Sequence, residues 1–332
     1  MQYRHHPVAS QTGPDFAAPL PASGYGWWYV DGLSDCGRHG LTLIAMLGCV
    51  FSPWYAWARS GGRRQVDPLE HSALNFALYG AVGHRWALTE RGAADVARST
   101  DQLTIGRSGL RWDGTALHAA INEITAPWPT RLQGRLRLVP QSLVGISHSI
   151  DRSGAHRWYP IAPQARIEVE FTHPRLQWQG HAYFDANQGL RPLEDDFRSW
   201  NWSRASLADH ARVYYDTEWR GGGGTSLALR FDAQGTQDCE PPPQRPLPRT
   251  LWGIERTTRC DEGAQASVEQ TLESGPFYAR SLVDTTVEGQ RTLAFHESVS
   301  LDRFASRWVQ TLLPVRLPRR PLKRSRQTVP LR

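Results

Sequence analysis

Residues 176–185, LQWQGHAYFD, alternate between two kinds of side chain, as a β-strand does when successive residues point to opposite faces of a sheet. One face carries apolar groups: Trp178, Ala182 and Phe184. The other carries groups that hydrogen-bond or exchange protons: His181, Tyr183 and Asp185. An acid beside aromatic rings suggests protonation chemistry on an apolar substrate. The alternative is that Asp185 ends a strand in water, at the start of a turn.

The flanking sequence extends this strand into an all-β protein. Residues 166–171 also alternate, and residues 172–175 supply a turn, so the two strands predict a hairpin. Elsewhere, short apolar or alternating runs recur about every ten residues between Gly, Asp, Asn and Pro, which is typical of β-barrels and sandwiches. Only residues 302–312 indicate a helix of moderate length.

Chain length and an internal likeness indicate two domains. A chain of 332 residues exceeds what one hydrophobic core usually organises. The aromatic strand opening at residues 26–29 recurs loosely at residues 200–202, which suggests two similar β-barrels in tandem. The expected organisation is given by four ranges: a flexible arm 1–23, an N-terminal barrel 24–192, a C-terminal barrel 193–315 and a basic tail 316–332.

The positive charge is concentrated at the C-terminus. The chain has 38 basic and 32 acidic residues, and residues 316–332 hold seven basic residues and no acid. The remainder is therefore close to neutral, which argues against a nucleic-acid-binding face. The tail could contact anionic lipid headgroups, each basic group contributing on the order of 1 kcal/mol. A solvated, disordered tail is the alternative.

Cysteine spacing and apolar runs predict a cytoplasmic protein with at most peripheral membrane contact. The four cysteines lie too far apart for a CxxC pair, and the polar N-terminus has no signal-peptide apolar region. The longest apolar stretch, residues 41–51, is shorter than the ~20 residues that span a bilayer.

No nucleotide, metalloprotease or serine-hydrolase motif is present, and no histidine pair has ligand spacing with a third candidate. We therefore predict neither a cofactor nor a metal. The glycine run 221–224 is not followed by Lys and Ser or Thr, so it predicts a hairpin loop.

Seven blocks of the chain together resemble one family. They are GYGWWYVD (24–31), HGLTLIA (39–45), VFSPWYAW (50–57), NFALYG (75–80), RWALTER (85–91), GPFYAR (275–280) and LLPVRLPR (312–319). In this combination and order they resemble the acyclic carotenoid 1,2-hydratases, also called hydroxyneurosporene synthases, of phototrophic bacteria. That family is similar in turn to proteins built from two lipocalin-like barrels, which agrees with the prediction of two similar β-barrels in tandem.

The resemblance implies cofactor-independent addition of water to the terminal C1=C2 bond of neurosporene, lycopene or a similar acyclic carotene, at the inner membrane. The family's site residues map onto Trp158, Tyr183 and Asp185. One departure is Cys36, in a polar turn where an acid is expected. If that turn touches substrate, activity or specificity differs here.

Hydration of an unactivated alkene begins with a strong acid, because protonating C2 places the charge on the tertiary C1. A free Asp titrates near ~3.9, and burial raises that value by up to ~3–5 units. Asp185 is therefore the expected general acid. Asp216 and then Asp31 are weaker candidates, since Asp216 lies on a strand that looks half-solvated.

Two aromatic residues have expected roles beside the acid. Trp158 would stabilise the cation through its indole face, by roughly 2 kcal/mol when desolvated. Tyr183 would stack near the cation or hydrogen-bond the acid or the water. Without the resemblance, ordinary barrel packing is the better explanation of both residues.

This chemistry requires a particular orientation of the strand 176–185. The polar face must turn into a barrel cavity and the apolar face must pack outward, with Asp185 close to Trp158. Two classes of function remain: a carotenoid hydratase and a non-catalytic lipocalin-like carrier of isoprenoids. The sequence leaves open the preferred carotene, hydration of one or both ends, and the oligomeric state.

Overall fold

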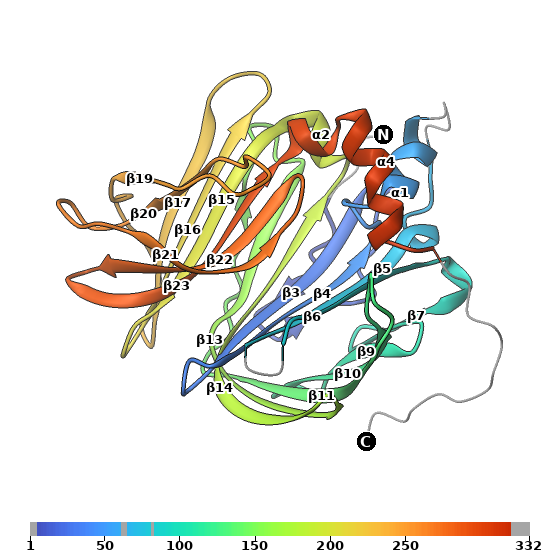
Figure 1. The fold of residues 1–332 in the computed structure, drawn as a ribbon, viewed down its shortest axis with the longest axis horizontal. Helices are drawn as coiled ribbons and strands as arrows, with labels where there is room; N and C mark the ends of the chain where they lie inside the picture. Colours follow the sequence, from blue (N-terminus) through green and yellow to red (C-terminus); the bar gives the residue numbers. More distant parts are fainter. Residues whose placement is uncertain (1–4, 61–64, 81–82, 320–332) are drawn as a thin grey trace. The chain divides into compact units, whose positions relative to one another are not determined.

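In the computed structural model, the described residues 5–60, 65–80 and 83–319 form two compact units, each built on an antiparallel sheet (Figure 1). Of the described residues, the first unit comprises 5–60, 65–80, 83–149, 155–192 and 311–319. The second comprises residues 150–154 and 193–310. The prediction of an all-β protein is confirmed.

The sheet of the first unit runs in the order β6-β5-β4-β3-β14-β13-β11-β10-β9-β8-β7, with β12 added beside β13. Its ends approach each other, β5 near β8 and β6 near β10, so the sheet is nearly closed into a barrel. The strands are β3 Tyr25–Ser34, β4 His39–Leu47, β5 Ser72–Gly80, β6 Arg85–Arg91, β7 Val96–Arg98, β8 Gln102–Ile105, β9 Ser108–Trp112, β10 Leu117–Ile124, β11 Arg131–Pro140, β12 His148–Ser149, β13 His156–His173 and β14 Arg175–Gly189.

The predicted hairpin is the pair β13–β14, and its apolar face forms part of the core of the first unit. Trp178, Ala182 and Phe184 are buried in one apolar cluster. In the same cluster, the rings of Phe76 and Phe171 stack with centroids 5.2 Å apart. The expectation that this apolar face packs outward is therefore wrong, because these side chains complete the barrel's apolar interior.

The N-terminal segment is part of the fold. It forms two short paired strands, β1 Ala9–Ser10 and β2 Gly13–Pro14. Val8 and Phe16 are fully buried in the core, and Trp28 Nε1 donates to the Val8 carbonyl at 3.2 Å. The expected flexible arm over residues 1–23 is therefore wrong for its described part, because its apolar side chains find partners inside the barrel.

Short helices complete the first unit, and the C-terminal segment returns to it. The helices are α1 Pro53–Ser60, η1 Pro68–His71 and η2 Ala93–Asp95. The expected helix at 302–312 is divided into α3 Leu301–Phe304 and α4 Arg307–Arg316. Residues 311–319 belong to the first unit, since Trp54 Nε1 donates to the Leu317 carbonyl and Glu90 N to the Pro318 carbonyl. Of these, residues 311–315 were expected in the second barrel and residues 316–319 in the basic tail. Most of the basic tail, residues 320–332, lies outside the described residues.

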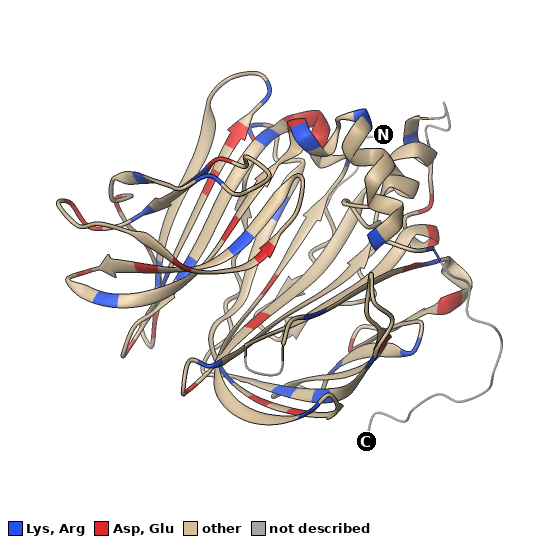
Figure 2. Cartoon of the chain, viewed as in Figure 1, with Lys and Arg blue, Asp and Glu red and all other residues tan. Residues whose placement is uncertain are grey.

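The second unit holds a seven-stranded sheet in the order β18-β17-β16-β15-β23-β22-β21, with β19 and β20 paired separately. The predicted glycine loop connects β16 to β17. Figure 2 shows basic and acidic residues interspersed along the strands of both units. The remaining elements are α2 Leu193–Asp196, β15 Phe197–Ser206, β16 Ala211–Trp219, β17 Gly224–Asp232, β18 Gly235–Asp238, β19 Gln244–Leu247, β20 Arg256–Arg259, β21 Ser267–Ser274, β22 Tyr278–Val287 and β23 Gln290–Ser300.

Candidate active site

Three adjacent strands of the first unit, β3, β14 and β13, carry the candidate site on the face opposite the apolar core. In the antiparallel register of β14 with β3, Tyr183 lies opposite Asp31 and Asp185 lies opposite Tyr29. Directly paired residues share one face of a sheet, so these four side chains form a single group. All four are buried.

Asp185 is at the centre of this group. Its carboxyl is 4% exposed, and Oδ2 accepts hydrogen bonds from Tyr183 Oη and from Trp158 Nε1, each at 2.7 Å. Trp158 and Tyr183 are themselves fully buried. The structure therefore brings together the three residues singled out from the sequence, although the polar face that carries them is not the face that encloses the apolar core.

Trp158 reaches Asp185 because β13 is irregular. The register of β13 with β14 shifts twice between Pro160 and Ala165. As a result Trp158 lies opposite Asn187. Without the shifts, the pairing of the outer part of the hairpin would extend to place Trp158 opposite Gly189, two residues farther from Asp185 along β14. The irregularity therefore moves the indole N–H into hydrogen-bonding reach of the carboxyl.

The pKa of Tyr183 is raised well above its usual value of 10.0. The largest cause is burial of the phenol, followed by the negative charge of Asp185, the hydrogen bond to that carboxyl, and the charge of Asp31. A phenol in this setting keeps its proton over the physiological pH range. Tyr183 is therefore a fixed donor toward Asp185.

Asp31 forms a second tyrosine–aspartate pair beside the first. Its side chain is fully buried, and Oδ2 accepts a hydrogen bond from Tyr29 Oη at 3.1 Å. The rings of Tyr29 and Tyr183 lie edge to face, with centroids 6.2 Å apart. Ranked last among the acids from sequence, Asp31 carries a recognisable signal, since Tyr29-Val30-Asp31 repeats the spacing of Tyr183-Phe184-Asp185.

Aromatic side chains continue this face toward the start of β3. Tyr25 and Trp27 are stacked with ring centroids 4.9 Å apart, and Tyr25 Oη lies 2.8 Å from His156 Nδ1. These residues alternate along β3 with the core residues Trp28 and Val30. The acidic group is thus bordered by aromatic rings, which suits an apolar, unsaturated substrate.

The other polar residues singled out from the sequence are His181, which precedes Tyr183 on the same face of β14, and Asp216. His181 pairs in register with Arg166 at the outer part of the hairpin, and its charge contributes to lowering the pKa of Asp35, behind the larger effect of the Arg166 hydrogen bond. Asp216 is in the second unit, where Arg259 contacts both its carboxylate oxygens.

Cys36 lies in the turn between β3 and β4 and is exposed. Its Sγ is 3.4 Å from Ser34 Oγ. Hydrogen bonds from Ser34 and then from Arg38 lower the pKa of the thiol to about 7. The turn follows the end of β3, beyond the buried acidic group.

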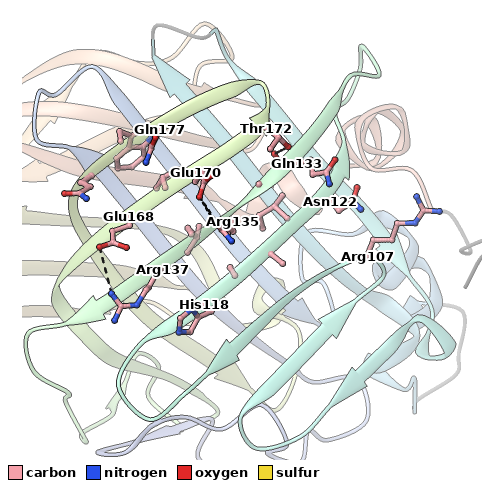
Figure 3. A pocket seen from close by; sticks show the side chains of 18 residues that line it. Arg107, His118, Asn122, Gln133, Arg135, Arg137, Glu168, Glu170, Thr172 and Gln177 are labelled. Atoms are coloured by element: carbon pink, nitrogen blue, oxygen red, sulfur yellow. Dashed lines mark hydrogen bonds and ion pairs between the residues drawn. The ribbon is translucent and has the colours of Figure 1, made fainter. Parts of the chain in front are cut away.

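Among the hollows of the described residues are two whose linings do not include Asp185. The larger, about 730 Å³, lies over β10, β11, β13 and the start of β14 (Figure 3). Arg135 pairs with Glu170 at 2.7 Å in its wall, and the labelled side chains are polar. The other, about 650 Å³, includes Asp216 in the second unit. The wall of the larger hollow also includes the apolar side chains of Ile121, Leu136 and Trp178, so its lining is mixed.

In the part of the chain that the structure describes, no three His, Cys, Asp or Glu side chains gather as metal ligands would. The ionisable groups at the candidate site include Asp31, Asp185 and their tyrosine partners, with His148 beside Trp158 (ring centroids 5.5 Å apart) and His156 beside Tyr25. This donor set provides proton transfer and hydrogen bonding.

Comparison with known proteins identifies sequence relatives. Residues 43–326 match the family described as Carotenoid hydratase CrtC. The chain is 52% identical over 309 residues to the acyclic carotenoid 1,2-hydratase of Thiocapsa roseopersicina, covering 92% of this chain and 76% of that relative. It is 49% identical over the same length, with the same coverage, to the acyclic carotenoid 1,2-hydratase of Rubrivivax gelatinosus.

Solved structures show the same fold at much lower identity. A putative AttH from Nitrosomonas europaea matches with a TM-score of 0.59 and 15% identity, covering 85% of this chain and 92% of that one. Kievitone hydratase from Nectria haematococca matches with a TM-score of 0.52 and 9% identity, covering 90% of this chain and 100% of that one. The fold is lipocalin-like.

Proposed function

Because the chain belongs to the carotenoid hydratase CrtC family and is a hydratase, we propose that it adds water to the terminal C1=C2 bond of acyclic carotenes such as neurosporene and lycopene. The product is a 1-hydroxy tertiary alcohol, and no cofactor is used. Asp185 is the proton donor, with Trp158 and Tyr183 assisting it.

The first step is transfer of a proton from the Asp185 carboxyl to C2. This breaks the O–H bond, forms a C–H bond and leaves a tertiary cation at C1. The carboxylate that appears is stabilised by the N–H of Trp158 and the hydroxyl of Tyr183, both already directed at Oδ2. Donors placed where charge develops in the transition state accelerate a reaction more than donors that must reorganise.

The second step is addition of water to the cation. A cation over an aromatic face gains roughly 2 kcal/mol or more where water is excluded. The buried rings of Trp158 and Tyr183 are available for this role, because each contacts the acid directly. The water oxygen then bonds to C1, and the alcohol forms when this water loses a proton.

The observation that carries the proposal is the double hydrogen bond onto the buried Asp185 carboxyl. The test is an assay of the purified protein with lycopene or neurosporene in lipid or detergent, without added cofactor. Wild-type protein should form the alcohol, and Asp185→Asn should lose on the order of 10²–10⁴ in rate while still binding pigment. If the wild-type protein leaves the carotene unchanged, the proposal is wrong and a non-catalytic carrier of isoprenoids is favoured instead.

We propose in addition that the protein meets its substrate at a membrane surface. Among the described helices, none has both the length and the apolar composition needed to cross a bilayer. In the first unit, however, α1 exposes Trp57 (41%) and the end of α4 exposes Leu312 (46%) and Val315 (72%). Exposed aromatic and aliphatic groups beside a basic segment favour an anionic lipid surface.

Flotation with vesicles containing phosphatidylglycerol tests the membrane proposal. Trp57→Ser combined with Leu312→Ser should reduce the bound fraction at least several-fold. Trp128→Ser is the matched control, since Trp128 is 81% exposed on another turn of the first unit and its loss should leave binding unchanged. Equal binding of all three proteins would contradict a docking surface on α1 and α4.

A further inference from the structure

The candidate site contains two buried carboxyls, and the proposed hydration employs only one of them. The two tyrosine–aspartate pairs have the same spacing on adjacent strands, Tyr29 with Asp31 on β3 and Tyr183 with Asp185 on β14. We infer that Asp31 is the general base that takes the proton from the water attacking C1. This inference rests on the proposed hydration, and it names the group that receives the proton lost by the water.

The register fixes how the two carboxyls are related. Asp31 lies opposite Tyr183, and Asp185 is two residues farther along β14, so the two acids are diagonal neighbours on one face. Diagonal neighbours in an antiparallel pair lie ~7–8 Å apart along the sheet, with their Cβ atoms somewhat closer, so both carboxyls can reach the same end of a substrate. Inverting glycosidases, which use one carboxyl as acid and a second as base toward water, keep those carboxyl groups ~6.5–9.5 Å apart, a separation that side chains on diagonal positions can adopt.

Hydrogen bonding distinguishes the acid from the base. Asp185 Oδ2 accepts hydrogen bonds from Trp158 and Tyr183, each at 2.7 Å, and Asp31 Oδ2 accepts one from Tyr29 at 3.1 Å. The two short bonds stabilise the carboxylate that Asp185 becomes when it gives its proton to C2. This geometry suits Asp185 as the donor and leaves Asp31, its diagonal neighbour, as the carboxylate that takes the proton of the water.

Electrostatic coupling supports the same arrangement. The charge of Asp31 is among the causes that raise the pKa of Tyr183, after burial and the effects of Asp185. The field of Asp31 therefore reaches the hydroxyl that contacts the acid. The same field would stabilise a cation formed next to Tyr183. It would also help the attacking water to lose its proton.

The protons balance without an outside acid or base. Asp185 loses one proton to C2, and the C1 cation forms. Water bonds to C1 as one of its O–H bonds breaks, and Asp31 takes that proton. Return of one proton from Asp31 to Asp185 restores both groups, and the net reaction is alkene plus water giving the alcohol.

Deuterium labelling in D₂O separates the two roles. In Asp31→Asn, Asp185 still protonates C2, and its carboxylate can take a proton back. Recovered carotene should therefore gain deuterium at C2, while hydration falls by about 10²-fold or more. Asp185→Asn should lose both deuterium exchange and hydration. If Asp31→Asn hydrates within a few-fold of the wild type, or is folded and loses exchange as well, Asp31 is not the base.

A second variant keeps the carboxyl and changes its basicity. Tyr29→Phe removes the hydroxyl that donates to Asp31 and retains the ring. The pKa of Asp31 should then rise, so the acidic limb of the pH–rate profile should move to higher pH; an unmoved limb would count against the inference.

Asp35→Asn is the matched control, because Asp35 follows the same strand and pairs on the surface with Arg166. It should hydrate at the wild-type rate. An inactive wild type would overturn the hydration itself, whereas an active wild type with an active Asp31→Asn would overturn only the role of Asp31.

Discussion

At the scale of single residues, the two donors onto Asp185 define what the site can do. Hydrogen bonds from Trp158 and Tyr183 to one carboxylate oxygen are of most value once the proton has left, because they then stabilise a buried negative charge. Burial of the whole group raises the cost of leaving that charge without donors. In the proposed mechanism, Asp185 therefore depends on both neighbours.

We predict that Tyr183→Phe and Trp158→Phe each slow hydration by about 10- to 100-fold. Each removes one hydrogen bond to a charged group, worth ~1.5–3 kcal/mol, and keeps an aromatic ring in place. Because both donors serve the same oxygen, the double variant should lose less than the product of the two single losses. Steady-state rates on one carotene, with thermal unfolding as the folding check, test this. Full activity in either single variant would contradict it.

Sequence periodicity predicted which residues of β14 share a face, but it could not predict their neighbours on β13. Asp185 and Trp158 are 27 positions apart, and their contact depends on two register shifts between Pro160 and Ala165. Such irregularities come from local packing, which alternation does not encode. The pairing of Tyr29 with Asp31 was readable as a repeated spacing, although its burial was not.

At the scale of elements, a buried carboxylate connects four segments of the first unit. Glu90 on β6 is fully buried and accepts hydrogen bonds from Ser52, just before α1, and from His71 in η1, the latter at 2.9 Å. Arg319 of the C-terminal segment lies 3.4 Å from the same carboxylate. The side chain of Glu90 therefore joins α1, η1 and the end of the chain to the sheet.

We predict that Glu90→Ala lowers the free energy of unfolding of the first unit by about 3–5 kcal/mol, because it leaves buried partners without their acceptor. Urea unfolding measures the loss. Glu70→Ala is a suitable control, since the Glu70 carboxylate is half exposed and lies 4.0 Å from the same arginine. A loss in Glu90→Ala no larger than in the control would show that the network contributes little.

This network also explains a boundary that the sequence did not reveal. The block 312–319 was expected to end the second barrel or to begin a tail, because it follows that barrel along the chain. Glu90 and Arg319 are more than 200 positions apart, and no local pattern indicates such a contact. The N-terminal segment was wrongly predicted to be a flexible arm for a related reason. It is mostly polar and contains several prolines, so its sequence does not indicate that Val8 and Phe16 are buried.

At the scale of the whole molecule, alternating runs in the sequence predicted the all-β class. They did not predict which polar side chains are buried inside the second unit. His296 on β23 is fully buried, and its Nε2 lies 2.8 Å from the carbonyl of Thr257 on β20. Burial, together with the positive charge of nearby Arg256, lowers the pKa of His296 to about 4, against a partial offset from that hydrogen bond. The folded protein therefore holds this imidazole neutral.

The consequence is a loss of stability in acid. Above pH 6.5, the unprotonated histidine is neutral in both states and has no pH effect. Between pH 6.5 and about 4 the unfolded chain takes up a proton that the folded chain refuses, so stability falls with each unit of pH. The total loss is roughly 3 kcal/mol, and below about pH 4 both states are protonated and the effect levels off.

His296→Gln should remove this pH dependence, because glutamine retains an N–H donor for the Thr257 carbonyl and does not titrate. Urea unfolding at pH 7.5 and pH 5 is therefore expected to show a smaller acid loss for the variant, in the transition of the second unit. The difference between variant and wild type isolates His296 from carboxyls that titrate in the same range. His118→Gln, which removes a partly exposed histidine paired with Asp113 in the first unit, should leave that transition as sensitive to acid as in the wild type. Equal acid losses for wild type and His296→Gln would mean that the buried imidazole does not oppose protonation.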